Sequence, residues 1–413
     1  MGKKVKKQAD PIWKKMADEY AESGEIPVGE APFAVGEQLQ GHVVDVAFGG
    51  EGVVRHENCV FFIHGVISGE KIVFEIVELK KNFGRGRLIE VIEPSPDRVS
   101  PKCPLFGECG GCQYQHMNYP SQLAMKHKQV RDIFERIGGL DGNCVEELLS
   151  CPQPYNYRNR IMVRTQWNRD LKQMVVGFLR HHSRLVVPVD ECHIAEEELN
   201  KQLTEVAANP SRKNGIKYVL RKFPDGWTLP NDSFFQNNFF LLPGMVGEVR
   251  KCLRNFGAEY LVDAYCGVGF FALELASEVK SFRGVEIDRM AIRAARKNAE
   301  SRGITNGEFV EGATEERLPE IMNDFPPHAT TVVLDPPRRG IDASAVNFLK
   351  SVAPGQILYV SCHPATQARD LAQFCADGQY RVEKIKPMDM FPQTQHVECV
   401  ADLRLVQSGG SVG

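Results

Sequence analysis

Residues 261–269 read LVDAYCGVG, an apolar run that ends in a turn with two glycines. This pattern is typical of a buried strand that turns into a helix and leaves its backbone open to a ligand. A second run, GVEID at residues 284–288, carries the acid Glu286, which can accept hydrogen bonds from ribose hydroxyls. A third, LDPPRRG at residues 334–340, places Asp335 before a rigid turn. The three runs predict neighbouring strands that end at one ligand site.

The segments around these runs alternate between strand and helix patterns. We expect strands at residues 260–264, 284–287, 331–334 and 356–361, and helices at residues 271–277, 290–301 and 343–352. This order predicts a mainly parallel, doubly wound sheet of the Rossmann-like α/β class. A dinucleotide dehydrogenase is a competing interpretation, but Ala272 stands where its third glycine belongs, so S-adenosylmethionine fits better. Arg338 follows the Pro-Pro where amino-group methyltransferases usually carry an aromatic, which indicates another methylation chemistry.

The N-terminal part has a different pattern. Short alternating runs, QLQGHVV at residues 38–44 and KIVFEIV at residues 71–77, predict an OB-like β-barrel in residues 31–95. Residues 1–30 are lysine-rich and lack an apolar period, so we expect a basic, flexible arm. The other predicted parts are a central mixed α+β domain at residues 96–235, with strands at 160–167 and 174–179, and a methyltransferase domain at residues 236–413.

The composition bounds the class of protein. A chain of 413 residues that is 43% hydrophobic can bury real cores, and it has no apolar run long enough for a membrane span or a secretory signal. We therefore expect a cytoplasmic protein that does not bind membranes, and the sequence does not indicate the oligomeric state. The net charge of −3 does not indicate a polyanion binder, but basic residues cluster near positions 3–15, 80–87 and 158–164, which favours phosphate contacts.

Two polar residues near the predicted sheet suit a difficult methylation. Carbon 5 of uracil attacks a sulfonium methyl only after a thiolate has added to carbon 6, and the carbon 5 proton must then be removed. Cys362, in LYVSCHPAT at residues 358–366, follows a buried-looking strand, and Glu398 ends the run MDMFPQTQHVE at residues 388–398. On base rates, a lone cysteine at a strand end packs in the core and a lone glutamate faces solvent.

A cysteine cluster lies in the central part, in CPLFGECGGC at residues 103–112. Tetrahedral zinc or an iron–sulfur cluster could use its three thiols, and each needs a fourth ligand. Cys192 is the best candidate for that ligand and Cys151 the second. Spacing alone does not separate zinc from iron–sulfur. The candidate ligands are Cys103, Cys109 and Cys112, with Cys192 or Cys151 as the fourth.

Together, the Asp335-Pro-Pro-Arg turn, the run that contains Cys362 and the run that ends at Glu398 resemble the RNA 5-methyluridine methyltransferase family. The resemblance covers residues 36–405. It implies Cys362 as nucleophile and Glu398 as proton acceptor, a TRAM domain for the barrel, and a [4Fe-4S] cluster on the four cysteines. It also implies contacts to S-adenosylmethionine from Gln236, in FFQNN at residues 234–238, and from Tyr265, Glu286 and Asp335, with Gly267 and Gly269 in the turn.

Two positions depart from the family pattern. Phe270 stands where members often carry Asn after the second glycine, and His363 follows the nucleophile where Asn is usual. The partner that the family implies is structured RNA. The barrel and the cluster favour 23S-type ribosomal RNA, with the T-loop of transfer RNA as the alternative. A non-catalytic RNA-binding or chaperone protein that keeps the fold is the alternative from another class.

Overall fold

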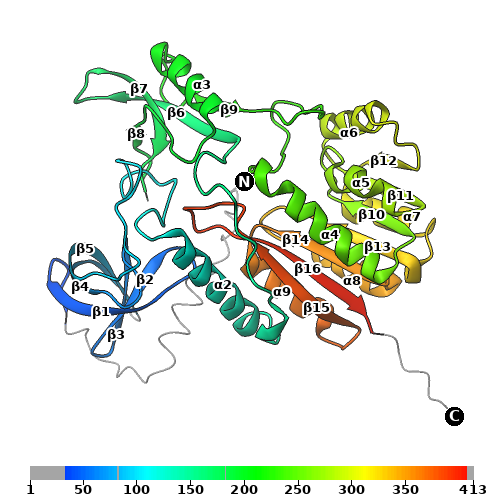
Figure 1. The fold of residues 1–413 in the computed structure, drawn as a ribbon, viewed down its shortest axis with the longest axis horizontal. Helices are drawn as coiled ribbons and strands as arrows, with labels where there is room; N and C mark the ends of the chain where they lie inside the picture. The colour runs from blue at the N-terminus through cyan, green and yellow to red at the C-terminus, as the bar shows by residue number, and fades with distance from the viewer. Residues whose placement is uncertain (1–32, 81–82, 182, 407–413) are drawn as a thin grey trace, which may run out of the picture. The chain divides into compact units, whose positions relative to one another are not determined.

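The computed structural model describes residues 33–80, 83–181 and 183–406 (Figure 1). The predicted basic arm at residues 1–30 lies outside this part. The chain forms two compact units. The first unit contains residues 1–125, 178–187 and 393–395, and the second contains residues 126–177, 188–392 and 396–413.

The first unit contains a closed barrel of five strands. These are β1 (Gln38–Val46), β2 (Glu51–His56), β3 (Cys59–His64), β4 (Lys71–Leu79) and β5 (Gly84–Glu93), in the order β1-β2-β3-β5-β4. Alternate side chains such as Phe61, Ile72 and Phe74 point into its core. The carboxylate of Glu70 is buried at the barrel's edge, where it accepts hydrogen bonds from Arg98 and from the backbone N–H of Ile67 (2.8 Å).

The segment that follows the barrel holds a helix and a small sheet. The helix is α2 (Tyr119–Arg136), and the sheet has the strand order β8-β7-β6-β9. Its strands β6 (Arg160–Asn168) and β7 (Gln173–Leu179) cover the two predicted there, and β8 (Val186–Pro188), β9 (Lys217–Arg221) and α3 (Glu197–Ala208) complete this part.

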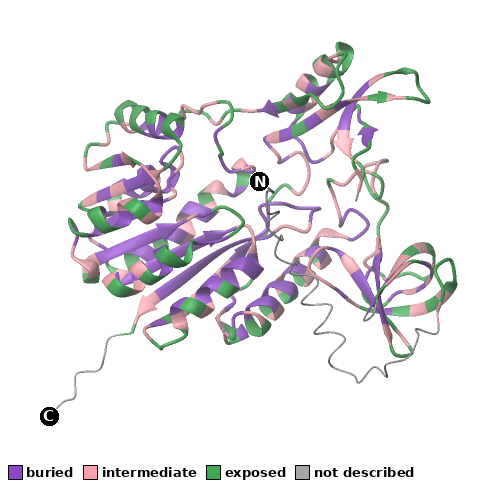
Figure 2. Ribbon diagram, turned by 180° about the vertical axis from the view of Figure 1, so that it is seen from behind, coloured by how far each residue is buried: buried purple, intermediate pink, exposed green. Residues whose placement is uncertain are grey.

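The second unit is built on a seven-stranded sheet with the order β12-β11-β10-β13-β14-β16-β15. The strands are β10 (Tyr260–Ala264), β11 (Ser281–Glu286), β12 (Gly307–Glu311), β13 (Thr330–Leu334), β14 (Gln356–Ser361), β15 (Tyr380–Met388) and β16 (Glu398–Leu405). The first five are parallel, and β16 inserts antiparallel between β14 and β15. All residues of β13 and β14 are buried (Figure 2), as expected for a sheet with both faces covered.

Six helices flank this sheet in two sets that pack within themselves. One set is α4 (Leu242–Phe256), α5 (Phe270–Leu275) and α6 (Arg289–Ser301), and the other is α7 (Thr314–Met322), α8 (Ala343–Val352) and α9 (Pro364–Cys375). The predicted α/β class, a Rossmann-like sheet with an N-terminal barrel, is therefore confirmed. The helix predicted at residues 271–277 ends at Leu275 and continues as a short 3-10 turn. In the described part of the chain, no helix has the length and apolarity needed to cross a membrane.

Candidate active site

The cofactor turn, residues 265–269, follows β10 at the point where the strand order reverses. Strand β10 pairs with β11 on one side and β13 on the other, and such a switch point is where open α/β sheets bind ligands. The backbone of Tyr265, Gly267 and Gly269 is left-handed, with φ of 65°, 54° and 85°. A Cβ on Gly269 would lie 2.7 Å from Phe309, whereas one on Gly267 would meet no heavy atom within 4 Å. The turn therefore leaves open space beside the Gly267 backbone.

Glu286 joins this turn to the start of α6. One carboxylate oxygen accepts from the N–H of Gly267 (3.1 Å), and the other accepts from the N–H of Asp288 (2.9 Å). Each oxygen keeps a lone pair for a ribose hydroxyl. Beside it, Ile287 exposes 70% of its surface and can cover an aromatic base. The hydroxyl of Tyr265 donates to Glu315 (3.0 Å). These donors, acceptors and the open turn fit the adenosyl part of S-adenosylmethionine.

Gln236 is buried, and its backbone carbonyl accepts a hydrogen bond from Asn159 Nδ2 (2.9 Å). The segment before it, residues 227–235, is tied to the cofactor turn by the buried side chain of Asn298 on α6. The Asn298 amide accepts from the N–H of Thr228 (2.7 Å) and donates to the carbonyls of Thr228 (3.1 Å) and Val268 (3.2 Å). Asn298 thus holds the segment before Gln236 against the cofactor turn.

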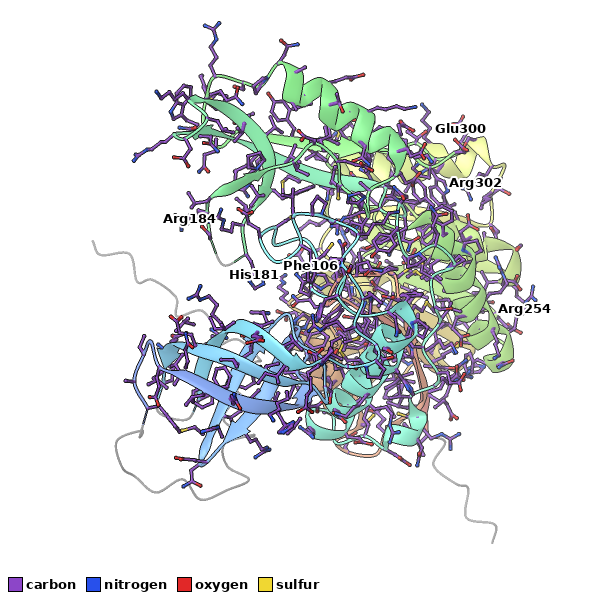
Figure 3. The ribbon with its side chains drawn as sticks, turned by 60° about the vertical axis from the view of Figure 1, so that its left-hand side comes forward. Phe106, His181, Arg184, Arg254, Glu300 and Arg302 are labelled. Atoms are coloured by element: carbon purple, nitrogen blue, oxygen red, sulfur yellow. The ribbon has the colours of Figure 1, made fainter. Side chains whose placement is uncertain are left out.

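A cation–π contact strengthens the same connection. Arg302, labelled in Figure 3, caps α6 and lies 3.9 Å from the ring centre of Trp227. The Trp227 ring also packs against Phe235 and Phe270, at 5.4 and 5.7 Å between centres. The chain before Gln236 is therefore packed onto the sheet unit by aromatic contacts as well.

The predicted nucleophile and base meet because of the register between β14 and β16. Ser361 on β14 pairs with Cys399 on β16, and the strands are antiparallel. The next residue along β14 and the preceding residue of β16 therefore face each other, and these are Cys362 and Glu398. Directly opposed residues on such strands have Cβ atoms roughly 5 Å apart. Cys362 is half-buried, and Glu398 exposes only 3% of its surface.

The charges around this pair affect its ionisation. Burial and the neighbouring Glu398 carboxylate raise the pKa of the Cys362 thiol to about 11, while the Arg338 guanidinium acts to lower it. Burial and Asp335 raise the pKa of Glu398 well above its usual value, and Arg338 again opposes the shift. Burial also raises the pKa of Asp335 to about 7. Cys362, Glu398, Asp335 and Arg338 thus form one electrostatic group at the end of the sheet.

Comparisons with known proteins identify the family of the chain. The family model for tRNA (uracil-5-)-methyltransferases matches residues 221–405. An uncharacterized RNA methyltransferase of Halalkalibacterium halodurans is 30% identical, with 91% of this chain and 99% of that protein covered. Another, from Thermosynechococcus vestitus, is 31% identical, with 85% and 94% covered. The chain belongs to the RNA uracil-5-methyltransferase family.

A solved structure extends the likeness to the three-dimensional fold. The tRNA (uracil-54, C5)-methyltransferase of Pyrococcus abyssi, crystallised with S-adenosyl-L-homocysteine, matches with a TM-score of 0.68 and 25% identity. The match covers 88% of this chain and all of that one. The chain is therefore an S-adenosylmethionine-dependent RNA methyltransferase of the uracil-5 family.

The two departures from the family pattern have structural explanations in this methyltransferase. Phe270 is buried and packs against Trp227 and Phe235, so it supports the segment before Gln236 through packing. His363 is the N-cap of α9, where its Nδ1 accepts hydrogen bonds from the N–H (3.3 Å) and hydroxyl (2.8 Å) of Thr366. Burial lowers the pKa of His363, so the ring is neutral at pH 7 and adds no charge beside the thiol.

The predicted metal ligands are divided between the two units. Cys103, Cys109 and Cys112 share one loop of the first unit, and Cys192 lies in the second. The loop is fixed by its neighbours: Gly110 N–H donates to Leu179 (3.0 Å). Within residues 33–80, 83–181 and 183–406, no three His, Cys, Asp or Glu side chains form a group that could hold a metal.

The second candidate for the fourth ligand, Cys151, is a buried core residue. Its thiol accepts a hydrogen bond from Asn238 Nδ2 (3.3 Å) and donates to the carbonyl of Gln153 (3.2 Å). Burial raises its pKa. This environment favours a packing role for Cys151.

Sequence reasoning missed several residues of the site. Asn298 and Arg302 carry no motif, because polar residues on an amphipathic helix usually face solvent. The sequence identified Arg338 as part of the Asp335-Pro-Pro-Arg turn and as the place of a missing aromatic ring, but it did not predict that its guanidinium acts on both Cys362 and Glu398. Its Nη2 also lies 3.5 Å from Nε2 of His396. Two successive polar residues after an Asp-Pro-Pro turn are the signal that could have identified it.

Proposed function

We propose that this methyltransferase transfers a methyl group to carbon 5 of a uridine in structured RNA through a covalent bond to Cys362. The observation that supports it most is the cross-strand placement of a thiol beside a buried carboxylate at the ligand end of the sheet. A thiol that only packed at a strand end would need neither the carboxylate nor the guanidinium beside it.

Cys362 and Glu398 have separate roles in this proposal. Cys362 adds to carbon 6 as a thiolate, and the electron pair displaced from the C5–C6 bond makes carbon 5 nucleophilic. S-adenosylmethionine, when bound, supplies the sulfonium methyl group that carbon 5 takes. Glu398 then accepts the carbon 5 proton, the C5–C6 double bond re-forms and the thiolate leaves. A carboxylate whose pKa is raised by burial is a stronger proton acceptor than one in water.

The cofactor would be held by the residues around the turn. The proposed residues are Gln236 before α4, Tyr265, Gly267 and Gly269 in the turn after β10, Glu286 at the end of β11 and Asp335 after β13. We infer that Glu286 binds the ribose and that the open backbone at Gly267 lets the ligand approach closely, as in other nucleotide sites.

The RNA can be of two kinds. The sequence favours 23S-type ribosomal RNA, whereas the structural relative from Pyrococcus abyssi acts on transfer RNA. In both cases a stacked uridine must leave its neighbours before Cys362 can reach carbon 6. Both RNAs are therefore needed to test the proposal.

The test is covalent trapping with 5-fluorouridine. Transcripts of bacterial transfer RNA and of 23S-type ribosomal RNA, made with 5-fluorouridine, are incubated with the protein and labelled S-adenosylmethionine, then run on a denaturing gel. Fluorine cannot leave as a proton, so the thiol adduct should persist. A labelled complex with wild type that is absent with Cys362→Ala supports the proposal. Cofactor binding without any complex on either RNA contradicts it, and loss of cofactor binding as well favours a pure RNA-binding protein.

The iron–sulfur cluster remains a prediction from the sequence, on Cys103, Cys109, Cys112 and Cys192. No step of the reaction proposed here uses it. Iron and sulfide content per chain, with an absorbance band that bleaches on reduction, would support it. A colourless protein with stoichiometric zinc would contradict it.

A further inference from the structure

A buried lysine outside the group of Cys362, Glu398, Asp335 and Arg338 binds the segment that leads to Glu398. Lys126, on α2, has no exposed surface. Its Nζ lies 2.6 Å from Asp389 Oδ1, 3.1 Å from the carbonyl oxygen of Phe391 and 3.2 Å from that of His396. An ammonium group has three protons to donate, and three oxygens accept them. The side chain thus holds one short stretch of chain at three points.

That stretch, residues 389–396, connects β15 to β16. It has no regular structure, so its carbonyls are not satisfied by a strand ladder. Side chains supply donors to some of them. Asn238 Nδ2 donates to the Met390 carbonyl (3.2 Å), and the Tyr157 hydroxyl donates to the Pro392 carbonyl (2.9 Å). Lys126 differs from both because it binds the beginning and the end of the stretch at once.

The end of the stretch is adjacent to the chemistry. His396 lies two residues before Glu398, and its ring lies next to Arg338, the guanidinium that acts on both Cys362 and Glu398. We propose that Lys126 is a positioning residue that fixes residues 389–396 so that Glu398 meets carbon 5 of the base held by Cys362. This inference rests on the proposed function.

The proposal predicts which step Lys126 controls. Addition of the Cys362 thiolate and transfer of the methyl group do not use the Glu398 carboxylate as a base. In the last step the C5–H bond breaks, its proton passes to Glu398, its electron pair re-forms the C5–C6 double bond, and the C6–S bond breaks as the thiolate leaves. A loosened stretch therefore slows proton loss more than methyl transfer.

The experiment counts the two events separately. The full chain is mixed with transcripts of transfer RNA and 23S-type ribosomal RNA labelled with tritium at carbon 5 of uridine, and with S-adenosylmethionine labelled with carbon-14. Tritium released to water reports proton loss, and carbon-14 in a protein–RNA complex on a denaturing gel reports a methylated adduct that has not resolved. In Lys126→Met we expect tritium release to slow by about 10- to 100-fold, since small displacements of a catalytic group cost that much. The methylated adduct should accumulate.

The controls separate positioning from stability. Tyr380→Phe removes another buried hydrogen bond, from the Tyr380 hydroxyl to the Pro354 carbonyl (2.8 Å), at the far end of β15. In this variant the ratio of tritium released to water to carbon-14 in the protein–RNA complex should equal that of wild type, whatever the melting temperature of the variant. If Lys126→Met does not fold because Asp389 is left buried and charged, the double variant Lys126→Met/Asp389→Asn removes that charge and keeps the test.

The outcomes are distinguishable. Wild type that forms no adduct with the 5-fluorouridine transcripts contradicts the proposed function itself. The positioning role alone is overturned if wild type forms the adduct but the Lys126 variants behave differently from the prediction. That result would be folded variants in which tritium release and methyl transfer fall in parallel or do not change.

Discussion

Ser361 and Cys399 form the last backbone pair between β14 and β16, and the residues just beyond them are Cys362 and Glu398. The sheet itself therefore places the thiol and the carboxylate opposite each other. Both strands are buried, so the backbone that carries Glu398 and the backbone that precedes Cys362 belong to the packed core of the sheet.

The two members of the pair should fail in different ways. Cys362→Ala should abolish both methylation and the adduct, because no bond to carbon 6 can form. Glu398→Gln should still methylate carbon 5 but keep the RNA attached, with proton loss reduced by about 100-fold or more. Denaturing gels with labelled S-adenosylmethionine and unmodified transcripts measure this. A Glu398→Gln enzyme that turns over like wild type would exclude this carboxylate as the base.

The rate of adduct formation should rise with pH. The pKa of Cys362 is raised to about 11, so below that value the reactive thiolate should grow about tenfold per pH unit. Arg338 lowers this pKa, so Arg338→Met should move the rise to higher pH. Rates of 5-fluorouridine trapping between pH 6.5 and 9.5 give both profiles. A wild-type rate that is flat over this range would show that thiol ionisation does not limit addition.

Asn298 should contribute to cofactor binding because it ties the segment before Gln236, residues 227–235, to the cofactor turn. We expect Asn298→Ala to weaken S-adenosylmethionine binding by about tenfold, the loss typical of a buried hydrogen-bonding side chain. Asn306→Ala is the matched control, since that amide also bridges two carbonyls, of Ala276 and Val279. Isothermal titration measures both. Equal weakening in the two variants would assign the effect to general destabilisation.

The barrel unit should lose stability in acid through Glu70. Burial acts to raise the pKa of this carboxyl, but hydrogen bonds from Arg98, Ile67 and Ser95 outweigh it, so the pKa is lowered. A carboxyl whose pKa is lower in the folded than in the unfolded state stabilises the fold at pH values above the unfolded-state pKa. This stabilisation is lost as the pH falls through the folded-state pKa. Glu70→Gln should therefore cost about 3 kcal/mol at pH 7 and less in acid, measured by urea unfolding at several pH values. A cost independent of pH would exclude the charge as its source.

The sequence predicted four of the five parallel strands and missed β12 (Gly307–Glu311). Strand β10 has the predicted bounds, because five successive apolar or buried positions before two glycines leave little choice. Strand β16, which begins at Glu398, was not predicted. Its residues include Asp402, which looks like a surface acid but is buried and accepts hydrogen bonds from Gln356 (2.8 Å) and Arg404. Local patterns cannot show such a partner as Gln356, since it comes from another strand.

The same limit explains Lys126. On α2 it stands near Lys128, which is exposed and pairs with Asp132, and nothing in the sequence tells the two lysines apart. Only the tertiary structure distinguishes them, because it brings Asp389 to Lys126 and leaves Lys128 in solvent. The sequence could therefore identify candidate residues at the ends of strands. It could not identify residues whose partners lie far away in the sequence.

Lys126 and Asp389 are separated by 263 positions. During synthesis on a ribosome, the helix that carries the lysine emerges long before the carboxylate that neutralises it. Until then that lysine must remain in water, because an unpaired ammonium is costly to bury. The helix can therefore dock in its final place only near the end of translation. A chain released before Asp389 is made would lack the base and would also leave this cation without its partner, so such incomplete products should be both inactive and easily degraded.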